Sequence, residues 1–326
     1  MNINLREVFS KAAFIRSLNL LAPISTVTID TLYKTVVNIP APVIPIADLF
    51  TDIKTVGLST RGGGYVNLSG TTEIGAKWVE PFPIRLKENL SAVDLNNLKM
   101  LSNDGIEAWR QQKINKLRQT NRATSEYQAV QALKGKIEMP VVTQDGSTAT
   151  YTVDYGATPT HTVSVKFDAT AATMASVEKD LLNMATKVKK SGYADIEFWA
   201  GQDVWFAIYQ LIASAPNDNR TAMKVDGQTI TTSAGKVVLR NEEVWNPKTK
   251  AFVPTVAATE IVCIAKNAPH TLAYAAIDDL DGGLQALPFF MKPVNDPEQG
   301  WRLLSESKPL PAPVIRAICW ATSVTG

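Results

Sequence analysis

The order of hydrophobic and polar residues predicts two long consecutive elements in the first half of the chain. Residues 52–84 follow a strand-turn-strand pattern around the run Thr60-Arg61-Gly62-Gly63-Gly64. Residues 91–134 are mostly polar and carry apolar residues in i, i+3 doublets, which predicts one helix about 60 Å long. A compact globule of this chain length is only about 50 Å across. Elements of this length are typical of chains that lie across neighbouring subunits, so the pattern indicates assembly.

The predicted long helix has a narrow apolar stripe and a wide polar face. Ser91 or Asp94 can cap its start, and Gly105 weakens its interior by ~1 kcal/mol relative to alanine, so a bend or break is expected there. The polar face is expected to be solvated, because aromatic residues that could stack on nucleic-acid bases are sparse. The stripe residues chosen as candidates for packing are Leu98, Leu101, Trp109, Leu117 and Tyr127.

The tip of the predicted hairpin is the main candidate interaction site. Three successive glycines permit positive φ and close backbone approach, and contribute no side chain to a core. A phosphate-binding loop would need a following Gly-Lys-Ser/Thr and a strand-to-helix context, and both are missing from the sequence. Projecting edge strands need a partner that covers them. The predicted inter-subunit contact residues are Ser59, Thr60, Arg61, Gly62, Gly63, Gly64 and Tyr65.

The second half of the chain predicts a hairpin followed by an α/β region. Residues 137–142 and 148–155 alternate with period two around an Asp-Gly turn, and residues 172–190 predict a helix that ends at Gly192. From residue 193 onward, short strands and helices alternate, and the final strand covers residues 313–323. The aromatic residues at the passage from strand to helix predict a core built from Trp199, Trp205 and Phe206.

Composition and motifs provide no sign of catalysis, a metal or a cofactor. The formal net charge is +2 at pH 7, which argues against wrapping nucleic acid or lying on an anionic membrane. The two cysteines, Cys263 and Cys319, lie in apolar strand-like runs and are expected to be buried thiols. The two histidines, His161 and His270, have no neighbours at metal-ligand spacing, and the acidic run from Asp278 fails the calcium-loop frame. Neither a membrane span nor a secretion signal is expected.

Ahead of the hairpin, Asn38 to Ile46 contains three prolines and predicts an extended arm. The order of elements along the chain is then arm, glycine-tipped hairpin, long helix, β-hairpin, α/β region and closing strand. The motifs are Ser59-Thr60-Arg61-Gly62-Gly63, Ala132-Leu133-Lys134-Gly135-Lys136 and Ser307-Lys308-Pro309-Leu310. This order resembles the major capsid proteins of tailed phages, in particular the lambda-type major capsid protein E family. The resemblance implies an α+β chain with the Hong Kong ninety-seven phage capsid fold.

The resemblance also implies a division of the chain. Its parts would be an N-terminal arm (1–51), an extended E-loop hairpin (52–84), a peripheral P domain with the spine helix (85–192), an axial A domain (193–300) and a closing strand that returns to the P domain (301–326). Relatives form hexamers and pentamers with themselves in an icosahedral head that encloses double-stranded DNA. The resemblance further implies a portal protein, a separate scaffold protein, a possible decoration protein and non-specific contact with packaged DNA. Such a subunit is not an enzyme; it would occupy the host cytoplasm before assembly and the virion afterwards.

Two other classes of function remain open at the level of sequence. One is a different virion or cage protein, such as a tail component or an encapsulin-like shell. The other is a soluble hydrolase that uses His161 or His270.

Overall fold

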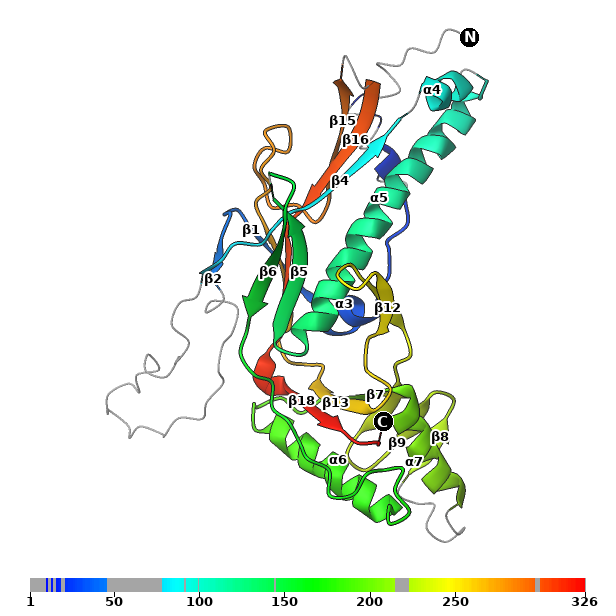
Figure 1. Cartoon of the computed structure of the whole chain (residues 1–326), viewed down its shortest axis with the longest axis vertical. Helices are drawn as coiled ribbons and strands as arrows, with labels where there is room; N and C mark the ends of the chain where they lie inside the picture. Colours follow the sequence, from blue (N-terminus) through cyan, green and yellow to red (C-terminus); the bar gives the residue numbers. More distant parts are fainter. Residues whose placement is uncertain are drawn as a thin grey trace, which may run out of the picture.

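The chain forms an elongated molecule in which a long helix runs away from a small α/β layer (Figure 1). The computed structural model describes residues 10, 13, 16–18, 21–45, 78–90, 92–98, 100–143, 145–214, 223–296 and 300–325. The helices with described bounds are α3 (Val27–Leu32), α4 (Ala92–Leu98), α5 (Asn103–Ala132), α6 (Met174–Lys189), α7 (Gln202–Ser214) and the 3-10 helix η3 (Ile315–Ala317).

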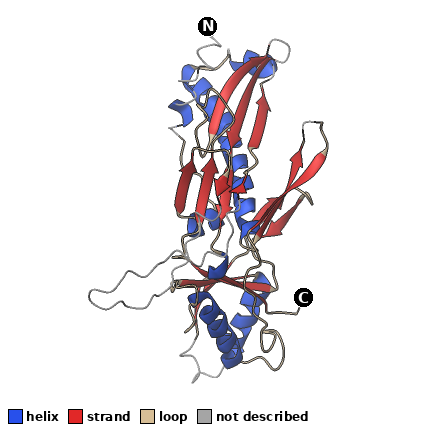
Figure 2. Ribbon diagram, turned by 90° about the vertical axis from the view of Figure 1, so that its left-hand side faces the viewer, coloured by secondary structure: helices blue, strands red, loops and turns tan. Residues whose placement is uncertain are grey.

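The largest sheet of the described residues has six strands and lies at one end of the molecule (Figures 1 and 2). Its order is β18 (Ile318–Thr322), β13 (Glu260–Ala265), β7 (Ile196–Ala200), β10 (Lys236–Leu239), β9 (Thr229–Thr231) and β8 (Lys224–Asp226). Strand β7 is parallel to β10 and antiparallel to β13, so the sheet is mixed.

Smaller sheets accompany the long helix. The two three-stranded sheets are β1 (Thr35–Ile39), β14 (Thr271–Ala275) with β17 (Pro309–Ala312), and β15 (Phe290–Asp296), β16 (Gly300–Ser307) with β4 (Ile84–Asn89). The two-stranded pairs are β2 (Ile44–Pro45) with β3 (Trp78–Val79), β5 (Lys136–Val142) with β6 (Thr148–Asp154), and β11 (Glu243–Asn246) with β12 (Ala251–Pro254). Helix α5 packs against β4, β5, β11 and β17.

Strand β7 joins the two halves of the hydrophobic core because both of its faces are buried. Phe198 and Ala200 pack with residues of α6 and α7, whereas Trp199 packs with Leu133 at the end of α5. This burial of both faces explains why the strand Ile196–Ala200 is mostly apolar and does not alternate between apolar and polar residues. The end of α5 is fixed to the sheet further by the indole of Trp320, whose Nε1 donates to the Leu133 carbonyl at 2.8 Å.

The prediction of one continuous helix over residues 91–134 is wrong. The chain forms α4, then a short connection, and then α5, which is about 45 Å long at 1.5 Å per residue. Ser102 begins α5 as its N-cap, and its Oγ accepts a hydrogen bond from the Gly105 amide at 3.2 Å. Leu98 therefore belongs to α4, and Leu101 lies in the connection. The break expected at Gly105 lies just before it, and the Gly105 amide is the donor to the Ser102 cap.

The β5–β6 hairpin and helix α6 are confirmed close to their predicted limits. Val142 pairs with Thr148 across the turn, where Gly146 has φ 82°, a conformation that glycine adopts without strain. Thr173 caps α6 in a reciprocal capping box with Ser176.

Two of the expected domain boundaries do not follow the packing. Helix α6 was assigned with the spine helix, but its apolar face (Val177, Leu181, Met184) packs in the same core as Phe198 of the six-stranded sheet. Strand β18 was expected to return to the spine-helix region, but it pairs with β13 at the edge of the six-stranded sheet. In that pair, the two free cysteines, Cys263 and Cys319, lie opposite each other. Strand β18 thus covers an apolar edge that β13 would otherwise leave open.

Candidate assembly surfaces

The predicted hairpin tip, Ser59 to Tyr65, lies outside the described residues, but its base is described. Strands β2 and β3 pair antiparallel there, with Ile44 opposite Val79 and Pro45 opposite Trp78. Ile44 and Val79 are buried in one cluster with Tyr127 of α5. Residues 45 and 78, on either side of the segment 46–77, are therefore held side by side.

The N-terminal arm is fixed to α5 by a buried carboxylate. Glu126 accepts hydrogen bonds from the backbone amides of Thr28 and Ile29, at 2.5 Å and 3.0 Å, at the start of α3. Amides in the first turn of a helix have no intrahelical acceptor. A carboxylate there satisfies two donors and is attracted by the positive end of the helix dipole. One turn earlier on α5, Arg122 forms an ion pair with Asp30. These contacts hold the arm against the spine helix.

Large apolar side chains are exposed at several places in the described residues, and three of these places are candidate assembly surfaces. Each of the three combines at least two such residues, and they lie at the α4–α5 junction, on the β11–β12 hairpin and on α7 (Figure 1). Single exposed apolar residues are ordinary, but clusters mark surfaces that bind other molecules. The residues are Val93, Met100 and Leu101 at the junction, Trp245 and Phe252 on the hairpin, and Phe206 and Tyr209 on α7.

Comparison with known families identifies the type of protein that carries these surfaces. The sequence matches the family model of the phage major capsid protein E over residues 10–324. The chain belongs to this family. Its members are structural proteins of phage capsids, so the resemblance found in the sequence is confirmed, and the family match favours a capsid subunit over a tail component, an encapsulin-like shell or a hydrolase.

Solved structures support the fold assignment independently of sequence. A protein ascribed to the capsid of a prophage in E. coli CFT073 is 15% identical, with 100% of both chains covered and a TM-score of 0.61. A phage-related protein from Bordetella bronchiseptica RB50 is 9% identical, with 96% of each chain covered and a TM-score of 0.52. A search of curated proteins found no match. The Hong Kong ninety-seven capsid fold is thereby confirmed for this family member.

The candidate stripe of the capsid spine helix is only part of its buried surface. Leu98, Leu117 and Tyr127 are buried and Trp109 is half-buried, but Leu101 is exposed. The polar face was expected to be solvated, and this is wrong for Arg110, which is buried. The buried polar residues of α5 are Arg110, Asn121, Ser125, Glu126 and Gln128. Periodicity of apolar residues could not identify them, because that pattern takes no account of polar side chains.

The aromatic residues chosen for the core divide into two groups. Trp199 is fully buried, whereas Trp205 is half-buried and Phe206 is 52% exposed, so the prediction of a buried Phe206 is wrong. Helix α7 is apolar on nearly all sides, and its buried face is Val204, Ala207 and Ile208. The sequence predicted a buried face on Trp205, Ile208 and residues 211–212, which is shifted from the observed face because apolar residues occur on almost every side of this helix.

The candidate chemical groups have structural roles. Asp180 contacts His161 Nε2 at 3.0 Å and also accepts from the Ser164 hydroxyl, so the serine bonds to the carboxylate and is not placed as a nucleophile beside the histidine. Burial and the adjacent Cys319 raise the pKa of the Cys263 thiol well above its usual value. Among the described residues, no group of three His, Cys, Asp or Glu side chains could hold a metal ion. In the same ranges, no helix has the length and apolarity of a membrane span.

Replacing Glu126 with glutamine is expected to lower the free energy of unfolding by ~2 kcal/mol, because charge-assisted bonds to two buried amides become one neutral bond. Urea unfolding of the unassembled subunit measures this loss. The arm should also become more sensitive to protease near Thr28. Glu243→Gln, which changes an exposed carboxylate on β11, is the matched control. Equal stability of the two variants would contradict a stabilising role for the Glu126 hydrogen bonds.

His270 is expected to make the subunit less stable in acid. Its Nδ1 accepts from the Val314 amide and its Nε2 donates to the Ala265 carbonyl, and burial lowers its pKa from 6.5 to about 4. Since the unfolded chain binds the proton first, stability falls as pH drops from about 6.5 to about 4, by ~3 kcal/mol in total. Urea unfolding at several pH values measures this, and His270→Gln should flatten the dependence. Identical pH profiles for both proteins would contradict it.

Proposed function

We propose that the chain is the shell subunit of a phage head, which forms hexamers and pentamers that close into an icosahedron around double-stranded DNA. The observation that carries this proposal is the family match over residues 10–324, nearly the whole chain. The three separate clusters of exposed apolar residues support it, because a subunit in a closed shell needs contacts on several sides. The subunit would occupy the host cytoplasm before assembly and the virion afterwards.

We assign the capsid domains according to the packing. The axial A domain is the six-stranded sheet with α6 and α7, and it includes the terminal strand β18. The peripheral P domain is α5 with the β4–β16–β15 sheet and the β5–β6 hairpin. We propose that residues 52–84 contain the E-loop that reaches a neighbouring subunit, and that Arg61 binds a carboxylate there.

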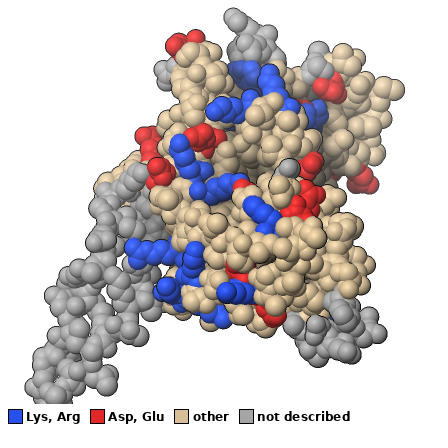
Figure 3. Space-filling view, turned by 60° about the horizontal axis from the view of Figure 1, so that its bottom comes forward, with Lys and Arg blue, Asp and Glu red and all other residues tan. Residues whose placement is uncertain are grey.

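The other partners of the shell follow from its proposed role. They are a portal protein and a separate scaffold protein, with a decoration protein as a further candidate. Contact with packaged DNA would be non-specific and weak. On the face shown in Figure 3, basic and acidic side chains both occur. The basic side chains form small separate groups and not one continuous patch. With a net charge of +2, the shell would not need to neutralise the genome.

Electron microscopy of the purified protein in negative stain tests the proposal. Round closed shells, or separate hexameric and pentameric rings, are the expected result. Tubes would indicate a tail component, and small cages of uniform size would indicate an encapsulin-like particle. Monomers or dimers under all conditions, including addition of a crowding agent, would contradict a shell-forming function.

A further inference from the structure

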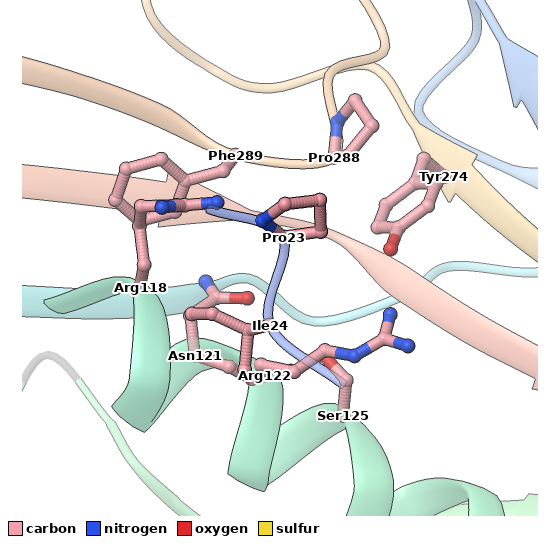
Figure 4. Close-up of a pocket in the computed structure, with 9 residues that line it drawn as sticks. All are labelled: Pro23, Ile24, Arg118, Asn121, Arg122, Ser125, Tyr274, Pro288 and Phe289. Carbon is pink, nitrogen blue, oxygen red and sulfur yellow. The ribbon is translucent and has the colours of Figure 1, made fainter. Parts of the chain in front are cut away.

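A cavity of about 220 Å³ lies where the arm crosses the spine helix, between residues 23–24, helix α5 and the segment before β15. Figure 4 shows Arg118 and Asn121 pointing into one part of it, under Pro23 and Phe289, while the Arg122 guanidinium and the Tyr274 hydroxyl face each other in another. At about 30 Å³ per water molecule, the space can hold a small organic group together with ordered water. Every residue that lines this cavity is in the described part of the chain.

The polar wall of the cavity offers hydrogen-bond donors. Asn121 is only 4% exposed, and among the described residues its Nδ2 has no hydrogen-bond partner. A buried amide without a partner is destabilising by about 1–3 kcal/mol, so it points to an acceptor that fills the space. Arg118 lies three residues earlier on the same face of α5, which brings the two side chains together.

Arg118 supplies a positive charge that no described neighbour balances. Arg122 is paired with Asp30, and the Glu126 carboxylate is bound by two backbone amides. Among the described residues, Arg118 forms no ion pair, and its guanidinium donates to the Ala22 carbonyl at 3.3 Å. Burial lowers the pKa of Arg118 from its ordinary value. The cavity thus combines one uncompensated positive charge with a free amide donor.

The opposite wall is apolar, and this decides the kind of anion. Pro23, Ile24, Pro288 and Phe289 would pack against a hydrocarbon group and would offer nothing to a second or third charged oxygen. A phosphate carries more negative charge than Arg118 alone can balance. We infer that the cavity is a binding site for a carboxylate attached to an apolar group, with its oxygens on Arg118 and Asn121.

Two sources could supply that carboxylate: a free organic acid or an acidic side chain of a second copy of the chain. Either would join the arm to the spine helix, because the cavity is lined by both. The site itself is formed within one subunit, so the inference does not require the shell. Only the second source depends on the proposed assembly.

Calorimetric titration of the unassembled subunit with benzoate tests the site. Benzamide has the same shape without the charge, and inorganic phosphate has charge without the apolar body. Benzoate is expected to bind saturably and more tightly than both. In Arg118→Gln and in Asn121→Leu, the affinity should fall about tenfold or more, as expected for loss of a bond to a charged group. Lys179→Gln, which removes an exposed charge on α6, should bind like the wild type.

Melting of the ligand-free variants shows whether they fold. Asn121→Leu replaces an unpaired buried amide with an apolar group of similar size, so it should melt at or above the wild-type temperature. A folded Arg118→Gln variant that binds benzoate as tightly as the wild type would overturn the inference. Equal binding of benzoate and benzamide would overturn it as well.

A high-resolution map of assembled particles, prepared without organic acids, distinguishes the two sources. Density that continues into an Asp or Glu of another subunit identifies a second copy as the source. A cavity that contains only water, together with saturable benzoate binding in solution, identifies a free acid. Water alone in the map and no saturable binding in solution would overturn the site, and neither result would bear on whether shells form.

Discussion

Replacing residues 46–77 with an Asn-Gly dipeptide is expected to give a folded subunit that forms no closed shells. Pro45 and Trp78 are paired across the β2–β3 ladder, so two residues are the length of loop that joins them, and Asn-Gly is the preferred sequence for such a turn. The body keeps its buried anchor residues Ile44 and Val79. The variant would lose only the segment proposed to reach the neighbouring subunit.

Circular dichroism and thermal melting of the unassembled variant provide the folding control, and electron microscopy provides the assembly measurement. A milder variant with Asn-Gly in place of residues 59–70 keeps the flanking strands and removes only the glycine-rich tip. If the tip makes the inter-subunit contact, both variants should fail to form shells. Normal particles from the longer replacement would show that the segment is not the assembly arm, and loss of folding in both would show that it stabilises the subunit itself.

Local sequence signals predicted the elements whose limits are set by their own residues. The β5–β6 hairpin was found because its Asp-Gly turn and its period-two pattern agree. Helix α6 was found because Gly192, at φ 90°, follows its end. The spine helix was predicted too long, because apolar doublets continue through Leu98 and Leu101 while a single serine cap interrupts the helix. An N-cap interrupts the backbone hydrogen bonds of the helix, but it does not change the spacing of the apolar residues.

Contacts between distant segments could not be predicted in the same way. Glu126 reads as one more polar residue on a helix, and its role comes from Thr28 and Ile29, nearly a hundred positions earlier. The carboxylate site has the same origin, because Asn121 becomes buried only when residues 23–24 and Phe289 fold over it. The closing strand was expected to return to the spine-helix region, and its pairing with β13 could not be predicted because an apolar strand fits any apolar edge. Cys319 lies opposite Cys263 in the neighbouring strand only because the complete fold brings β18 and β13 together.

Trp199→Ala is expected to lower the free energy of unfolding by ~3–5 kcal/mol, the usual range for removal of a buried tryptophan. Its ring is fully buried between the sheet and the end of α5, and the Arg240 guanidinium lies 4.6 Å from the ring centroid. Its Nε1 donates to Glu197 at 2.8 Å, so the substitution also leaves a buried carboxylate with one donor fewer. Urea unfolding of the unassembled subunit measures the change.

Trp205→Ala is the matched comparison, because it removes the same side chain from the neighbouring helix α7. Trp205 is half-buried and stacks on Tyr209 at the surface, so its loss should be smaller, about 1–2 kcal/mol, as for substitutions that leave no closed cavity. Trp199→Phe separates the two effects at the buried site in part, since it removes the N–H donor but keeps most of the ring volume. Its expected loss is about 1–2 kcal/mol. If Trp205→Ala were the more destabilising of the two alanine variants, the core would lie on the face of α7 that the structure leaves exposed.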